Sequence, residues 1–141
     1  MSKALQVSLA FITNAEQRVL IAQRSKNSDM GGCWEFPGGK IEHQEKPEEA
    51  LKRELFEELG IIIHTSHFVT QLMHDYPSKT VLLHVYHVME YSGVLHCCEK
   101  QQGMRWVEVH ELAQYDLLDA GFRLIPYLAS LLSIPYEPHH V

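Results

Sequence analysis

Several features of membrane, secreted or nucleic-acid-binding proteins are missing from this sequence. No run of apolar residues approaches the roughly 20 that a membrane-spanning helix needs. Residues 1–12 lack the basic start, long apolar stretch and small-residue cleavage site of a secretory signal. There is no block of basic residues, and the formal net charge is −6, which argues against polymeric DNA or RNA as the partner. We therefore expect a cytoplasmic protein that binds neither polymeric nucleic acid nor a membrane.

Cysteine is scarce, and its positions do not suggest a disulfide framework. Cys33, Cys97 and Cys98 are odd in number, and two of them are adjacent, so we expect reduced thiols. Histidine is more abundant, with ten residues, but no spacing assembles a metal site. His84 and His87 fall on a predicted strand, where their odd offset sends them to opposite faces.

The remaining composition is that of an ordinary globular protein. The chain has 141 residues, of which 45% are hydrophobic and 21% charged. This length predicts a single domain over residues 1–141 that is large enough to bury a core. There is no internal repeat, linker or low-complexity segment.

An acidic amphipathic segment is the most informative part of the chain. Pro47 suits the first position of a helix and Gly60 suits its left-handed end, which predicts a helix between them. At about 100° per residue, an apolar stripe lies beside a stripe of three acids. These acids are Glu54, Glu57 and Glu58. Like charges at this spacing destabilise a helix, whereas Mg²⁺ takes carboxylates as ligands. The spacing therefore predicts a cation site.

The residues on both sides of this helix complete a longer pattern. A glycine is followed after five residues by glutamate, and after seven more by Arg-Glu-apolar-any-Glu-Glu-any-Gly-apolar. Its positions are filled by Gly39, Glu45, Arg53, Glu54, Leu55, Glu57, Glu58, Gly60 and Ile61. The pattern resembles the signature of the Nudix hydrolases. A surface helix that merely happens to be acidic is the alternative, and it does not account for the spacing.

The order of predicted elements agrees with this resemblance. Apolar patterns predict strands at residues 5–12, 19–23, 68–74, 81–90 and 104–109, with a short extended piece at 33–36 and an apolar segment at 61–64. A second helix is expected at about residues 122–132, although Pro126 leaves its start open, since proline belongs in the first turn. We expect an α+β protein with the Nudix fold, an α/β/α sandwich with a mixed β-sheet.

The resemblance implies a chemistry and a metal cofactor. Members of the family cleave a nucleoside diphosphate linked to another group, using water and divalent cations. The implied cofactor is Mg²⁺, with Mn²⁺ as an alternative. Its implied ligands are Glu54, Glu57, Glu58, Glu99 and the backbone carbonyl of Gly38.

The resemblance also implies roles in catalysis. Arg53, Glu54, Glu58 and Glu99 are the expected catalytic residues, with Glu54 or Glu99 as the general base. Arg53 would pair with a glutamate of the motif and fix its rotamer. Glu45 would brace the loop against the helix or ligate the metal through water.

The assignment of Glu99 depends on a loop whose spacing departs from the family. In MutT-type members the acid stands two residues before a glutamine, whereas Glu99 stands three residues before Gln102. A one-residue insertion explains this, and a different loop geometry is the alternative. Glu99 could also be a solvated loop acid.

Residues 34–42 resemble the MutT subgroup, whose members convert 8-oxo-dGTP to the monophosphate and pyrophosphate. The implied substrate is therefore a small nucleotide, and the protein is expected to be a monomer or a weak homodimer. The implied substrate-binding residues are Arg24, Glu35, Phe36, Pro37, Gly38, Lys40, Tyr76, Lys79 and Asp119. Arg24, Lys40 and Lys79 would lie near the phosphates. Leu5, Val7, Tyr76 and Val81 would be apolar walls of the pocket, or simply part of the core.

One departure from the subgroup concerns the base. Its members read the oxidised guanine with an asparagine amide, and here Gly121 of the stretch Asp119-Ala120-Gly121 takes that place. Asp119 would take over the contact, or the base preference has changed. Gln44 and Lys46 also replace a usual glycine and a usual helix-capping Ser or Thr, and neither should affect catalysis.

Other functions remain open on the sequence alone. Another triphosphate, such as a pyrimidine nucleotide, is the rival substrate. ADP-ribose and dinucleoside polyphosphates are less favoured, and Pro77 decides little between them. A nucleotide-sensing Nudix module without activity is the alternative from another class, but such modules typically lose the glutamates of the motif, which are all present here.

Overall fold

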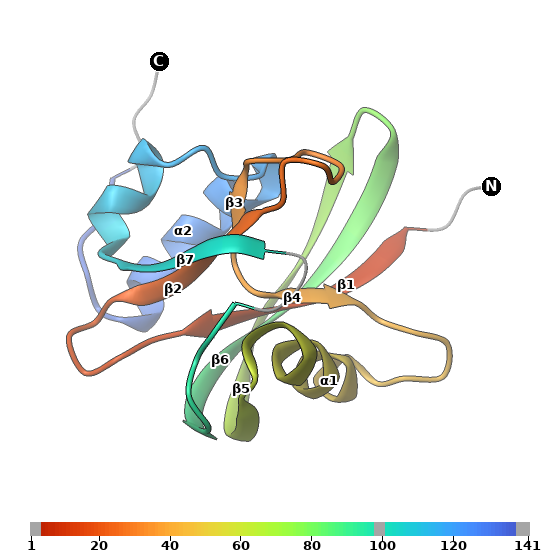
Figure 1. Ribbon diagram of the computed structural model, residues 1–141. Helices are drawn as coiled ribbons and strands as arrows, with labels where there is room; N and C mark the ends of the chain where they lie inside the picture. Colours follow the sequence, from red (N-terminus) through yellow and green to blue (C-terminus); the bar gives the residue numbers. More distant parts are fainter. Residues whose placement is uncertain (1–3, 98–100, 138–141) are drawn as a thin grey trace.

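The computed structural model describes residues 4–97 and 101–137 of the chain. Figure 1 shows the order of its helices and strands. They are β1 (Leu5–Ile12), β2 (Val19–Arg24), β3 (Trp34–Glu35), β4 (Gly38–Lys40), α1 (Pro47–Leu59), β5 (Ile62–Tyr76), β6 (Lys79–Ser92), β7 (Gln101–Val107), the 3₁₀ helix η1 (Val109–Gln114) and α2 (Asp119–Leu131).

The strands form two sheets. One is mixed and four-stranded, in the order β4-β1-β6-β5, and β1 runs parallel to β6 in it. The other has three antiparallel strands in the order β3-β2-β7. Strand β1 lies in the interior of the first sheet, where it pairs with β4 on one side and with β6 on the other. This arrangement confirms the predicted mixed sheet and adds a second one.

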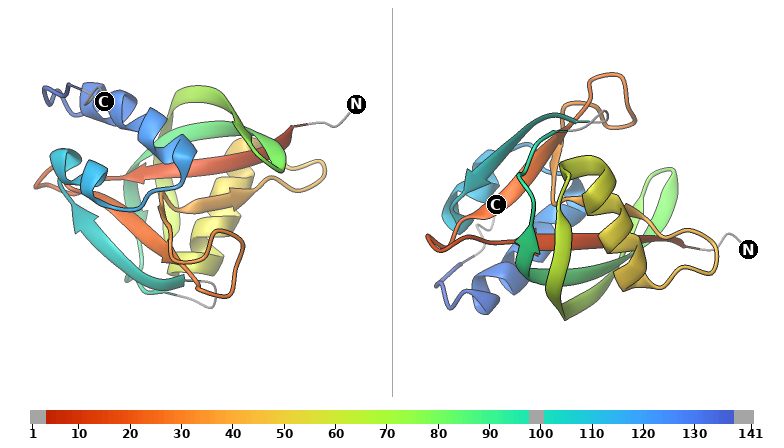
Figure 2. Two further views of the ribbon diagram at one scale, coloured as in Figure 1. Left: turned by 90° about the horizontal axis from the view of Figure 1, so that it is seen from above. Right: turned by 60° about the horizontal axis from the view of Figure 1, so that its bottom comes forward.

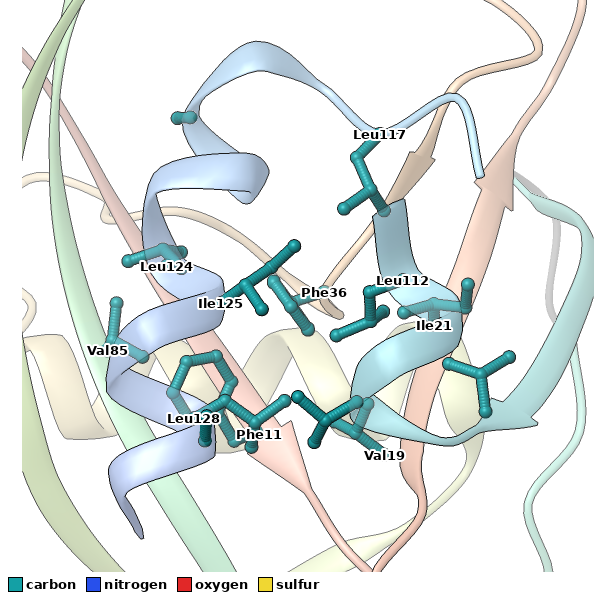
Figure 3. Packing of buried hydrophobic residues seen from close by; sticks show 14 of the residues in the cluster. Phe11, Val19, Ile21, Phe36, Val85, Leu112, Leu117, Leu124, Ile125 and Leu128 are labelled. Carbon is teal, nitrogen blue, oxygen red and sulfur yellow. The ribbon is translucent and has the colours of Figure 1, made fainter. Parts of the chain in front are cut away.

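The two helices cover opposite faces of the mixed sheet (Figure 2). Ala10 and Ile12 of β1 share one buried cluster with the apolar stripe of α1. Phe11 points the other way and shares a second cluster with Leu124 and Leu128 of α2 (Figure 3). Alternation along one strand therefore supplies both cores, and the expected α/β/α sandwich is confirmed.

The first helix matches its prediction at both ends. Its N-terminal residue is Pro47, and Gly60 follows Leu59 with φ of 71°, a left-handed conformation that glycine adopts without strain. Leu51, Leu55 and Leu59 are buried, which fixes the rotation of the helix about its axis.

Several of the predicted boundaries were wrong. The strand expected at 68–74 and all but the first residue of the apolar segment 61–64 belong to the single strand β5, whose register shifts near Thr65 and Phe68 interrupt the alternation of apolar and polar residues. The last strand ends at Val107, because Val109 already belongs to η1. The glycine pair was not expected to form a strand, but Gly38–Lys40 pairs with β1.

Helix α2 begins at Asp119, three residues before its predicted start, with Pro126 inside it. Proline removes one backbone donor from the helix. Leu124, Ile125 and Leu128 are buried against the sheets, and this packing outweighs the local preference. Within residues 4–97 and 101–137, no helix combines the length and apolar character that a membrane crossing requires.

Candidate active site

Strand β4 brings its glycines against the acidic helix. Gly38 has φ of 150°, and a Cβ on it would approach the Ser8 carbonyl oxygen to well under 3.0 Å. A Cβ on Gly39 would similarly collide with the carboxylate of Glu54. Only glycines at both positions allow β4 to pair with β1 while the Glu54 carboxylate lies directly on its backbone.

Helix α1 places its three acids differently. Because Leu51 and Leu55 are buried in the core, Glu54 and Glu58 lie beside β4, and both line a cleft. Glu57 is not among the residues that line this cleft, and 57% of its side chain is exposed. The predicted acidic face thus divides into two inward carboxylates and one outward carboxylate.

Arg53 ties the acidic loop to the helix. Its Nε and Nη2 donate to the two carboxylate oxygens of Glu45 at 2.8 and 3.0 Å, a bidentate arrangement. Its Nη1 donates to Glu54 at 2.9 Å, and Nη2 also donates to the carbonyl oxygen of Lys40 at 3.0 Å. The hydrogen bonds from Arg53 lower the pKa of Glu45 to about 2. Arg53 thus holds the Glu54 carboxylate in position, and Glu45 braces the loop.

Carboxylates outnumber their cationic partners at this end of the cleft. Burial, followed by the charges of Glu54 and Glu35, raises the pKa of Glu58 to about 8, although the backbone N–H of Gly38 opposes this rise. Burial also raises the pKa of Glu35, against the lowering effect of Arg24. Such crowding of acids is unfavourable without added positive charge.

The cleft itself crosses the mixed sheet and has a volume of about 700 Å³. Its floor is apolar and consists of Leu5, Val7, Leu9, Val81 and Leu83. The floor residues of β1 follow the strand alternation, so Leu9 could have been predicted from Leu5 and Val7. All four residues expected as apolar walls, Tyr76 included, line the cleft.

Two of the three basic residues expected near the phosphates, Arg24 and Lys79, have anionic partners. Arg24 donates through Nη1 to Glu35 at 2.9 Å and through Nε to the carbonyl oxygen of Asp29 at 2.8 Å. Lys79 lies 3.3 Å from the carboxylate of Asp29, a contact that no sequence pattern predicted. Lys40 lines the cleft and is exposed.

Some expected substrate-binding residues lie away from the cleft lining. Pro37 is buried, and its carbonyl oxygen accepts the N–H of Ala10 at 2.8 Å. Asp119 is exposed and does not line the cleft, whereas Ala120 and Gly121 do. Glu99 lies outside the described residues.

The donor set is compatible with a hard divalent cation. Glu54, Glu58 and the nearby backbone of Gly38 offer oxygen atoms, which Mg²⁺ and similar ions prefer, and the raised pKa of Glu58 shows that added positive charge would be favourable there. In the described part of the chain, however, no three His, Cys, Asp or Glu side chains already form a group that could hold an ion. A third carboxylate from the described residues would require side-chain movement, to which outward-facing Glu57 could contribute.

Comparison with models of protein families shows the family to which the chain belongs. Residues 3–128 match the NUDIX domain. This chain belongs to the Nudix family. It is thus a hydrolase of phosphoanhydride bonds, and Nudix hydrolases generally depend on divalent metals.

Characterised Nudix relatives are similar over most of their length. The chain is 36% identical over 126 residues to a CTP pyrophosphohydrolase of Escherichia coli, covering 89% of this chain and 90% of the relative. It is 37% identical over 123 residues to an 8-oxo-dGTP diphosphatase of Haemophilus influenzae, covering 87% and 90%. An 8-oxo-dGTP diphosphatase of Escherichia coli is 33% identical over 129 residues, covering 92% and 99%.

Solved Nudix structures have the same fold. The ORF135 protein of E. coli has a TM-score of 0.76 at 35% identity, with 93% of this chain and 90% of the other covered. A MutT Nudix hydrolase from Burkholderia pseudomallei has a TM-score of 0.81 at 26% identity, with 89% and 98% covered.

Proposed function

We propose that this protein is a Mg²⁺-dependent nucleoside triphosphate pyrophosphohydrolase whose preferred substrate is 8-oxo-dGTP. The products are 8-oxo-dGMP and pyrophosphate, so the enzyme removes a mutagenic precursor before DNA replication. The main support for this activity is the pair of inward carboxylates, Glu54 and Glu58, which lie beside Gly38 at one end of the 700 Å³ cleft. Mn²⁺ is an alternative cofactor. Relatives named 8-oxo-dGTP diphosphatase support this substrate.

In this proposal the acids would hold the metal and the basic residues would hold the phosphates. Glu54, Glu57, Glu58 and the carbonyl of Gly38 would be ligands, together with Glu99. The bound ion would neutralise phosphate charge and lower the pKa of the attacking water.

The remaining roles in this proposal concern the proton and the phosphates. Glu54 or Glu99 would accept the proton of the attacking water. Arg53 keeps Glu54 aimed at the cleft through its 2.9 Å hydrogen bond. Arg24, Lys40 and Lys79 would contact the phosphate oxygens.

Pyrophosphate release from a panel of nucleotides with Mg²⁺ tests this proposal. Glu58→Gln should lower kcat by several orders of magnitude, because it removes a ligand charge and little volume. Glu48→Gln, on the exposed first turn of α1, is the matched control and should retain wild-type activity. Activity of Glu58→Gln near the wild-type level would refute its role. Tight nucleotide binding by the wild type without any turnover would instead favour a sensor.

A pyrimidine triphosphate is the second candidate substrate. Gly121 lines the cleft in the position expected for the base-reading asparagine, and it has no side chain to offer. A relative named CTP pyrophosphohydrolase is similar over most of its length. These observations favour a base preference that differs from that of MutT-type enzymes.

Gly121→Asn tests which base the cleft favours. A Cβ on Gly121 would lie 3.5 Å from Leu117, an ordinary contact, so the side chain can be accommodated. The variant should increase the ratio of kcat/KM for 8-oxo-dGTP to that for dGTP by about tenfold or more, because a matched amide discriminates strongly. An unchanged ratio would show that the base binds elsewhere.

We further propose that residues 1–141 form one Nudix domain that acts in the cytoplasm as a monomer or weak homodimer. The shared cores of the two sheets support one folding unit. Sedimentation velocity over a range of concentrations tests the oligomeric state.

A further inference from the structure

Tyr76 connects the edge of the mixed sheet to the start of helix α2. It is the last residue of β5, its ring lines the cleft, and it is partly buried. Its hydroxyl oxygen accepts the backbone N–H of Ala120 at 3.1 Å. The N-cap residue of α2 is Leu118, which cannot cap through its side chain, so the tyrosine hydroxyl performs this task from another element.

The hydroxyl of Tyr76 still has a hydrogen to donate. A phenol can accept and donate at the same time, and the contact with Ala120 uses only the oxygen lone pair. Among the residues that the structure describes, none accepts a hydrogen bond from this hydroxyl. Burial raises the pKa of Tyr76, so the hydroxyl keeps its proton at neutral pH. A partly buried donor in the wall of a cleft therefore remains available to a ligand.

Sheet order separates this donor from Glu54. Strand β4, which contacts Glu54, forms one edge of the sheet, and β5, which carries Tyr76, forms the other. The intervening strands β1 and β6 provide the apolar floor, and three inter-strand steps span roughly 14 Å. A nucleotide whose phosphates lie at the acidic end would extend its base across the floor toward β5.

The surroundings of Tyr76 fit a base. Ala120 and Gly121 line the same part of the cleft with little or no side chain, while Val81 and Leu83 offer apolar surface. The small residues leave room beside the hydroxyl, and they supply no side-chain donor of their own.

We propose that the hydroxyl of Tyr76 donates a hydrogen bond to a carbonyl oxygen of the nucleobase and so determines base specificity. This inference rests on the proposed nucleotide hydrolysis and names the contact that replaces the missing amide at position 121. Guanine, 8-oxoguanine and cytosine carry such a carbonyl oxygen, whereas adenine and 2-aminopurine do not.

Tyr76→Phe tests the contact, because it removes the hydroxyl and keeps the ring. The kcat/KM of the variant is measured for the best natural nucleotide, for 2-aminopurine deoxyribonucleoside triphosphate, and for ribose 5-triphosphate, which has no base. The ratio of the natural nucleotide to each of the other two should fall about tenfold, the effect of one lost hydrogen bond. Tyr127→Phe, an exposed tyrosine of α2 outside the cleft, should leave both ratios unchanged.

The controls separate a base contact from a structural effect. An equal loss with all three substrates, or ratios that stay within twofold of the wild type, would overturn the inference, since a misplaced α2 affects every substrate alike. If Tyr76→Phe does not fold, the wild-type enzyme provides the test: it should prefer dGTP to 2-aminopurine deoxyribonucleoside triphosphate, and equal kcat/KM values would overturn the inference. Failure of the wild type to hydrolyse any nucleotide would instead refute the proposed function.

Discussion

Glu58 is the residue in which the competing forces at the site are most evident. It is partly buried near Glu54 and Glu35, and its pKa of about 8 lies well above the ordinary value of 4.5. Folding therefore favours the protonated carboxyl, whereas a metal ligand must be ionised. A bound cation, as in the proposed function, would relieve this repulsion.

This acid predicts how the stability of the metal-free protein depends on pH. Between pH 4.5 and about 8, the folded state holds a proton on Glu58 that the unfolded chain has released. The free energy of unfolding should therefore fall as pH rises through this window, by an amount on the order of a few kcal/mol. Urea unfolding at a series of pH values, in the presence of a chelator, measures this change in the free energy of unfolding.

Glu58→Gln should remove most of this pH dependence, since an amide does not titrate. It should be more stable than the wild type at pH 8.5 and similar to it at pH 4.5. Glu48→Gln, which is exposed, serves as the control and should follow the wild type. The same slope in all three proteins would contradict the assignment.

At the scale of the element, helix α1 has an incomplete N-terminus. Lys46 occupies the N-cap position with φ of −79° and ψ of 153°. The Glu49 carboxylate accepts the N–H of Lys46 at 2.8 Å. A lysine side chain has no acceptor, so the reciprocal half of a capping box cannot form.

Lys46→Ser should therefore stabilise the protein by about 1 kcal/mol. The serine hydroxyl can accept a backbone N–H of the first turn, and the extended backbone at this position already suits it. Equilibrium unfolding in urea provides the measurement, and pyrophosphate release should not change. Lys52→Ser, at an exposed position within α1, is the matched control and should lower stability slightly. A lower stability of Lys46→Ser would show that the lysine contributes more than its position suggests.

The sequence predicted some elements better than others, because some depend on neighbouring residues and others on residues far away along the chain. The ends of α1 depend on Pro47 and Gly60, which act locally, and both were predicted correctly. The extent of β5 depends on its pairing with β6 and on register shifts near Thr65, which no pattern within the strand reveals. The start of α2 depends on Tyr76, 44 residues before Ala120.

At the scale of the whole molecule, the sequence located the acids better than the cleft. Arg53, Glu54 and Glu58 belong to one short pattern, and the structure brings them together as expected. The partners of Arg24 and Lys79 come from separate segments, so the contacts with Glu35 and Asp29 follow only from the fold. Asp119 was assigned through the resemblance to the MutT subgroup, and the start of the helix turns it outside the cleft lining. The ligand roles of the acids remain predictions.

Metal binding should stabilise the entire domain, because α1 and β4 both contact the acids. At a Mg²⁺ concentration of 100 times Kd, linkage predicts about 2.7 kcal/mol of added stability. Thermal unfolding with Mg²⁺, and again after a chelator, measures it. Glu58→Gln should lose most of the Mg²⁺ effect. An unchanged melting temperature in the wild type would argue against the site.

The parallel pairing of β1 with β6 has a consequence for synthesis. Leu5 lies beside Val81 and Val7 beside Leu83, so the cleft floor joins the beginning of the chain to its second half. A nascent chain that has left the ribosome only as far as α1 already carries the whole acidic motif, yet it lacks the part of the floor that β6 supplies through Val81 and Leu83. Competence to bind substrate must therefore arise late in translation, after β6 has emerged and docked.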